Sequence, residues 1–190
     1  MTSVDGGVST LPLRIVAHVV PPSSEVDDTA FHAALAISDG LFPHQIEGIA
    51  FLLARRRSIL ADDMGLGKTL QAIAFMVWLQ DEAKAGRREA APFLIVAPTG
   101  LLGTWRKEIE QHVDQHGLGP LIPAFGGTLK TLREESGLTE RDIQTGKAAL
   151  DANAWREGGV VPTTYETMRD YHFSFARTRF GLIAYDEIQK

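Results

Sequence analysis

A glycine-rich segment at residues 62–69, with the sequence DDMGLGKT, contains the residue types that bind phosphate. Gly65 and Gly67 allow the backbone to turn its N–H groups toward an anion, because no Cβ blocks the approach. Lys68 supplies a mobile cation for the β and γ phosphates of a nucleotide, and the Thr69 hydroxyl can ligate Mg²⁺. The segment predicts a phosphate-binding loop that runs into a helix, whose positive dipole end attracts the same anion.

This segment matches the general phosphate-loop pattern only in part. The spacing G-x-x-x-x-G-K-T would place its first glycine at position 62, where the chain has Asp62. A chance glycine-rich turn is the alternative interpretation. A strand expected at 58–61 and an apolar helix expected at 69–79 favour the phosphate loop, because this motif requires both neighbours.

A second group with chemical potential is the acidic pair Asp186 and Glu187, which follows the apolar run at 182–185. An acidic pair at the carboxyl end of a buried strand is placed as nucleotide hydrolysis requires. Asp186 would hold Mg²⁺, and Glu187 would orient and deprotonate the attacking water. The pair alone is weak evidence, since an exposed acidic turn has the same sequence, but together with Lys68 it points to a hydrolytic site.

Short apolar runs alternate with helical patterns along the chain, and these elements must position both groups. Strands are expected at 11–20, 58–61, 93–97, 121–125, 160–164 and 182–185. Helices are expected at 42–57, 69–79 and 102–112. Alternation of this kind predicts an α/β fold, with a mostly parallel sheet covered by helices on both faces.

Composition excludes several other classes of protein. The 190 residues are 44% hydrophobic and contain no cysteine, so a disulfide-stapled scaffold and a cysteine-ligated zinc site are excluded. The net charge of −5 argues against a basic domain that coats nucleic acid. No apolar stretch approaches the roughly 20 residues of a membrane helix, and residues 1–7 have no basic signal region, so no membrane partner is expected.

Five segments, in order along residues 41–190, resemble the Swi/Snf class of superfamily 2 helicase-like ATPases. The family's phosphate loop usually reads DEMGLGKT, so Asp62 is the residue that the resemblance would place there. The matching segments are LFPHQIEG at 41–48, ILADDMGLGKTLQ at 59–71, LIVAPT at 94–99, VPTTYET at 161–167 and DEIQ at 186–189. The third segment is followed by Leu101, Leu102 and Trp105, as in the family's motif Ia. Ile188 is a mild departure from the family's motif II.

The resemblance implies a RecA-like nucleotide-binding lobe that uses ATP and Mg²⁺. It implies that Gln45 pairs with the adenine edge and that Thr69 and Asp186 hold the metal. It assigns catalysis to Lys68, Asp186 and Glu187. The nucleotide-binding residues that it implies in the loop are Asp63, Met64, Gly65, Leu66, Gly67, Lys68 and Thr69.

The resemblance also implies translocation along double-stranded DNA without strand separation. Thr99, Thr163 and Thr164 are the expected contacts to one DNA strand, since hydroxyls at strand ends suit phosphate binding. Ordinary turn and helix-capping chemistry is the alternative for these threonines. ATP in such motors lies between two lobes, so a second RecA-like lobe with an arginine finger is an expected partner. This lobe is expected to be incomplete at its C-terminus and to hydrolyse ATP very slowly alone.

We divide the chain into residues 1–40, a leader or the tail of an upstream element, and residues 41–190, the ATP-binding lobe. Two alternative functions remain open: a phosphate-loop switch without a nucleic-acid partner, and a non-catalytic interaction module. The expected location is intracellular, either a bacterial cytoplasm or a nucleus. Trp78, Trp105 and Trp155 are expected to pack in the core or between helices.

Overall fold

The computed structural model describes residues 28–60, 65–113, 117–133 and 149–187. The chain divides into two compact units, Met1–Phe75 and Met76–Lys190. None of the helices in the described ranges is long and apolar enough to cross a membrane.

A three-stranded parallel sheet forms the centre of the second unit. Its strands are paired in the order β2-β1-β3, with bounds β1 (Phe93–Val96), β2 (Val160–Thr163) and β3 (Leu182–Tyr185). The first two strands are fully buried, as expected for apolar runs covered on both faces. Val96 pairs with Thr163 on one side and with Tyr185 on the other, so the residues that follow all three strands emerge at one edge.

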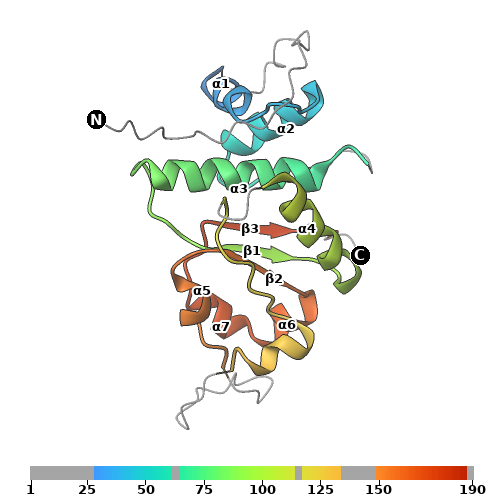
Figure 1. Cartoon of the computed structure of the whole chain (residues 1–190), viewed down its shortest axis with the longest axis vertical. Helices are drawn as coiled ribbons and strands as arrows, with labels where there is room; N and C mark the ends of the chain where they lie inside the picture. Colours follow the sequence, from blue (N-terminus) through green and yellow to red (C-terminus); the bar gives the residue numbers. More distant parts are fainter. Residues whose placement is uncertain (1–27, 61–64, 114–116, 134–148, 188–190) are drawn as a thin grey trace, which may run out of the picture. The chain divides into compact units, whose positions relative to one another are not determined.

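Short helices follow the strands of the second unit. They are α4 (Thr99–His112), α5 (Asn153–Arg156), α6 (Tyr165–Asp170) and α7 (His172–Ala176), with a 3-10 helix at Gly126–Lys130. Figure 1 shows α5, α6 and α7 gathered beyond β2, and α4 near the arrowheads of the strands. A buried cluster joins Leu94, Val96 and Val161 of the sheet to Trp155 and Phe175, whose rings stack 5.7 Å apart.

The first unit is built from helices. They are α1 (Asp28–Ala36), α2 (Pro43–Leu53) and the beginning of α3 (Lys68–Lys84). Phe31 and Ala34 of α1 pack against Ile46 and Ile49 of α2. The sequence did not predict α1, although its buried residues fall on one helical face. The domain division at residue 40 stays a prediction, and α1 packs on the helix that follows this division.

The structure corrects the expectation of a strand before the phosphate loop. Residues 58–60 have no strand geometry, and Ile59 is 79% exposed. A strand needs a partner, and the described part of the first unit contains no strand to pair with this run. The expected helix at 42–57 is shorter than predicted, because α2 ends at Leu53 and Ala54 caps it.

The expected strand at 121–125 forms only in part. Leu121 and Ala124 make isolated parallel bridges to Val160 and Thr163, so this segment follows β2 without a continuous ladder. The expected helices at 69–79 and 102–112 are confirmed within α3 and α4, and both extend beyond the predicted bounds. The strand expected at 11–20 lies outside the described residues.

Candidate functional site

The phosphate loop approaches α3 through two glycines with left-handed backbone conformations. Gly65 has φ +86° and Gly67 has φ +79°, values that side chains with a Cβ rarely adopt. Lys68 and Thr69 then open the 17-residue helix α3. The backbone N–H groups of its first turn have no helical acceptor, so this end can bind an anion. Asp63 and Met64 of the predicted loop lie outside the described residues.

Three side chains converge on one carbonyl of this loop. The Leu66 carbonyl oxygen lies 3.3 Å from Nε2 of His44, and it accepts hydrogen bonds from Nε2 of Gln45 at 3.3 Å and from Nε2 of Gln71 at 3.4 Å. His44 and Gln45 come from the first turn of α2, whereas Gln71 belongs to α3. The loop is therefore connected to both helices through a single peptide group.

Two glycines make these contacts possible. A Cβ on Gly67 would overlap the Gln45 amide, and a Cβ on Gly48 would overlap the Gln71 carboxamide. Gln71 is fully buried, so its side chain occupies the space that Gly48 leaves on α2. Glycine is thus required at position 67 for two reasons, which are its left-handed backbone conformation and the close approach of the Gln45 side chain.

Both the oxygen and the nitrogen of the Gln45 carboxamide form hydrogen bonds within the chain. Its Oε1 accepts a hydrogen bond from the Phe42 N–H at 3.0 Å, while its Nε2 donates to Leu66. The side chain is 7% exposed. A carboxamide has a second N–H and a second lone pair. The adenine contact stays a prediction, and it would have to use these remaining positions or replace the present bonds.

Three hydrogen bonds from different elements of the second unit hold Asp186, the first residue of the acidic pair. The Asp186 N–H donates to the Val96 carbonyl at 2.9 Å, which prolongs the β1–β3 pairing by one residue. The Tyr165 hydroxyl donates to the Asp186 carbonyl at 2.7 Å. The Trp105 indole N–H donates to Oδ2 of Asp186 at 2.9 Å. The position of Asp186 is therefore fixed through both backbone and side chain.

Glu187 follows in a strained conformation. Its φ of +54° is the one positive value at a non-glycine position in the described part of the chain. Such a conformation costs about 1–3 kcal/mol and tends to occur at functional sites. The Tyr165 bond fixes the peptide that leads into this residue, so the turn that directs the Glu187 side chain is supported from α6.

The pKa of the Tyr165 hydroxyl reflects the nearby charges of Asp186 and Glu187. Burial and, after it, the negative charge of Asp186 raise the pKa of the Tyr165 hydroxyl above its usual value of 10.0. Tyr185 and Glu187 act in the same direction. The Tyr165 ring also stacks on that of Tyr185, with ring centres 6.4 Å apart. Tyr165 therefore stays protonated at physiological pH and acts as a hydrogen-bond donor.

The three threonines proposed for DNA contact differ in exposure. Thr99 is exposed and begins α4. Thr163 is fully buried, and its hydroxyl donates to the Ala124 carbonyl at 2.7 Å. The Thr164 hydroxyl caps α6 by accepting the Thr167 N–H at 3.1 Å. Phosphate contacts from the latter two hydroxyls would compete with these bonds.

The donor chemistry of the chain fits a magnesium nucleotide. Mg²⁺ prefers oxygen ligands and usually binds through one or two protein groups together with substrate phosphates. The Thr69 hydroxyl in the first unit is a group of this kind, and so, taken separately, is the half-buried Asp186 carboxylate in the second. The left-handed glycines and the first turn of α3 fit the phosphates themselves, because such a backbone can direct several N–H groups toward an anion.

Comparison with known families identifies the class. Residues 44–190 match the family model described as the SNF2-related domain. The chain belongs to this family. The predicted resemblance to Swi/Snf-type helicase-like ATPases is thereby confirmed. ATP use is the property of this family that bears most directly on the phosphate loop.

Individual members of the SNF2-related family resemble this chain over much of its length. Zorya protein ZorD of Escherichia coli O139:H28 is 36% identical over 77% of this chain and 14% of its own length. Human DNA excision repair protein ERCC-6-like is 48% identical over 67% of this chain and 9% of its own. The RAD54-like DNA repair and recombination protein of Drosophila grimshawi is 30% identical over 80% of this chain and 19% of its own length. The chain thus spans a small part of each of these relatives.

A solved structure agrees with the fold. The SWI2/SNF2 ATPase core of Sulfolobus solfataricus, solved in complex with dsDNA, matches with a TM-score of 0.54 and 24% identity. The match covers 91% of this chain and 29% of that one. It confirms the expected α/β, RecA-like fold class.

The sequence did not predict the partners of the site residues. Trp105 was expected to pack, and it is indeed buried, but it also donates to Asp186. The Tyr165 contact and the bonds to Leu66 were not expected either. Tyr165 lies within the segment at 161–167 and Trp105 belongs to the motif Ia region, and this placement is the signal that could have indicated their roles.

Proposed function

We propose that this chain is the ATP-binding lobe of a double-stranded DNA translocase of the Swi/Snf class. Paired with a second RecA-like lobe, it hydrolyses ATP to ADP and phosphate. The observation that carries the proposal is the loop backbone, in which left-handed glycines at 65 and 67 lead directly into Lys68 at the start of a long helix. The DNA substrate places this activity inside the cell.

The residues of the first unit bind the nucleotide in this proposal. Backbone N–H groups of residues 65–69 surround the phosphates, and the Lys68 ammonium compensates their charge. Thr69 contributes a hydroxyl to the metal, which supplies further charge stabilisation when bound. Gln45 lies beside the loop and is the proposed adenine contact.

The acidic pair of the second unit performs the proton chemistry. Glu187 orients a water molecule for in-line attack on the γ phosphate and accepts its proton. Asp186 provides a carboxylate to the metal. Most of the rate enhancement comes from positioning and charge stabilisation, so the fixed backbone at 186–187 suits the task.

Duplex DNA and a second lobe complete the proposed activity. An arginine finger from a second lobe is worth about 10³–10⁵ in rate, so the lobe alone should turn over very slowly. Thr99, Thr163 and Thr164 are the proposed contacts to one DNA strand. Few phosphates are neutralised by such a surface, so binding should be weak and strongly dependent on salt.

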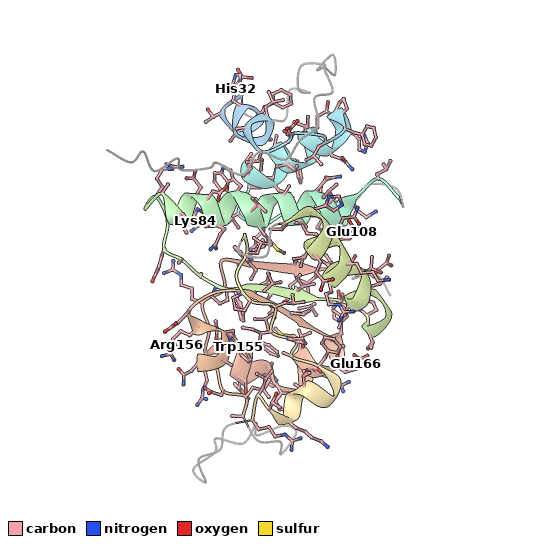
Figure 2. All side chains as sticks on the ribbon, viewed as in Figure 1. His32, Lys84, Glu108, Trp155, Arg156 and Glu166 are labelled. Atoms are coloured by element: carbon pink, nitrogen blue, oxygen red, sulfur yellow. The ribbon has the colours of Figure 1, made fainter. Side chains whose placement is uncertain are left out.

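Replacement of Lys68 tests nucleotide binding directly. Lys68→Ala should weaken binding of a fluorescent ATP analogue at least about tenfold, because a charge-assisted hydrogen bond contributes ~1.5–3 kcal/mol. Lys84→Ala is the matched control. Lys84 lies at the other end of the same helix, where its side chain is 54% exposed and pairs with Asp81 at 3.6 Å (Figure 2).

The two variants separate a site effect from a general charge effect. Lys84→Ala should bind the analogue as the unmodified chain does, and both variants should unfold at similar denaturant concentrations. Equal binding by Lys68→Ala and the unmodified chain would exclude the phosphate-loop assignment. Nucleotide binding without any response to duplex DNA in the two-lobed protein would favour a switch module instead.

A further inference from the structure

The carboxylate of Asp186 is oriented by a neutral donor from a distant part of the chain. The Trp105 indole N–H binds Oδ2 at 2.9 Å, across 81 residues of sequence. Trp105 is 4% exposed, so packing within α4 fixes the direction of its N–H. An indole orients a carboxylate without cancelling its charge, whereas an arginine at the same place would neutralise it. The carboxylate therefore remains available to a cation.

The backbone of Asp186 is held independently of that bond. Its N–H is paired with Val96 of β1, and its carbonyl accepts the Tyr165 hydroxyl. With the main chain fixed, the remaining freedom of this residue is rotation of its side chain. The Trp105 bond to Oδ2 restricts that rotation.

We propose that Trp105 is a positioning residue for magnesium, holding the Asp186 carboxylate in the orientation that binds the ion. The inference rests on the proposed function, since it requires Asp186 to be a ligand of the nucleotide's metal. Partners that orient metal ligands typically account for 10–100-fold in metal affinity. Tyr165 supports the same residue through its backbone, so its removal should act on the turn at Glu187 rather than on the carboxylate.

A second tryptophan provides a matched control. Trp155 is 1% exposed, and its indole N–H donates to the Thr178 hydroxyl at 2.9 Å. Figure 2 labels Trp155 on α5, among the helices beyond β2. Replacing either tryptophan by phenylalanine removes one buried indole hydrogen bond of the same length. Only the Trp105 bond ends on a carboxylate of the site.

The test compares the affinity of this chain for a fluorescent ATP analogue in Mg²⁺ and in EDTA. In Trp105→Phe, the ratio of the affinity in Mg²⁺ to the affinity in EDTA should be about tenfold smaller than in the unmodified chain. The affinity in EDTA should be unchanged. Trp155→Phe should leave both values unchanged, although both variants lose stability. A purely structural role of Trp105 would lower both affinities together and leave their ratio intact.

The indole N–H signals in nuclear magnetic resonance spectra provide a readout that needs no nucleotide. The chain has three tryptophans, and each variant assigns one signal. Asp186→Ala should move the Trp105 signal and leave that of Trp155 in place. If Trp105→Phe does not fold, the Asp186→Ala spectrum still tests the contact between the indole N–H and the carboxylate.

The outcomes distinguish this inference from the proposed function. If the unmodified chain gains affinity from Mg²⁺ but Trp105→Phe retains the full gain, the inference is wrong and the proposed function stands. If Asp186→Ala leaves the Trp105 signal unmoved, the inference is also wrong. If the unmodified chain binds no nucleotide in either condition, the proposed function fails and the inference fails with it.

Discussion

The phosphate loop and the acidic pair are positioned by different means. In the first unit, side-chain bonds of 3.3–3.4 Å from two helices converge on Leu66, which is itself 38% exposed. In the second unit, bonds of 2.7–2.9 Å reach Asp186 from β1, α4 and α6. The acidic pair therefore has the shorter bonds and the more continuous support.

This difference suits the two proposed tasks. A loop held by longer bonds at an exposed peptide can rearrange around a triphosphate at low cost, because local stability follows local contacts. A carboxylate pair that must stabilise charge and direct a water molecule works best when its geometry is fixed beforehand. We expect nucleotide binding to change the loop more than the acidic turn.

Substitution of Gly67 should have the largest effect on the loop. Gly67→Ala places a Cβ in a left-handed backbone and against the Gln45 amide. The loop would have to turn its N–H groups away from the phosphates. Losing two such bonds to a charged group, each worth ~1.5–3 kcal/mol, weakens binding about 100-fold or more. Titration with a fluorescent ATP analogue measures this loss.

Gly86→Ala separates backbone strain from the contact with Gln45. Gly86 has φ +72°, but open space surrounds the position of its Cβ. Both substitutions should cost about 1–2 kcal/mol of folding stability from the left-handed conformation. Only Gly67→Ala should weaken nucleotide binding, and equal nucleotide affinity in the two variants would show that the loop geometry does not hold the phosphates.

A smaller effect is expected at the acidic turn, as a function of pH. Folding raises the pKa of Tyr165, so the folded chain keeps this proton after the unfolded chain has lost it. The resulting stabilisation is fully present below about pH 10 and is lost as pH rises through the folded pKa. Denaturant unfolding from pH 8 to 11 should show this decline.

The neighbouring ring provides the control for that titration. Tyr165→Phe should flatten the decline above pH 10, whereas Tyr185→Phe should largely retain it, because Tyr185 is 47% exposed. A decline of the same steepness in Tyr165→Phe and in the unmodified chain would mean that Tyr165 is not the group responsible. The support of the acidic turn by α6 would then need another explanation.

Continuous apolar runs allowed most of the sheet to be predicted from the sequence. The runs at Phe93, Val160 and Leu182 form the strands expected of them, since a short apolar run is a signal that is local in sequence. Only the first two of these strands are buried on both faces, whereas exposed and half-buried residues alternate along β3. The run at Ser58 gave the same signal but no strand, because pairing depends on a partner that the run itself does not specify. The helix α1 was not predicted from the sequence, because most of its residues are small.

The contacts that position the site depend on pairs of residues far apart in the sequence. Trp105 reaches Asp186 only because β1 and β3 pair in register, which brings the start of α4 and the end of β3 to one edge. The approach of Gln71 to α2 depends on the missing side chain of Gly48. Residue types and spacing predicted which residues would do the chemistry, and that assignment stays a prediction. They did not predict which neighbours hold those residues in place.

The most direct test of the account is ATP hydrolysis by the two-lobed protein in the presence of duplex DNA. We expect DNA to stimulate hydrolysis in the unmodified protein and in Glu108→Gln, a control on α4 whose partner is His112. Glu187→Gln should bind ATP with unchanged affinity but show no stimulated hydrolysis. Hydrolysis by Glu187→Gln at the unmodified rate, or a lack of response to DNA in the unmodified protein, would contradict the account.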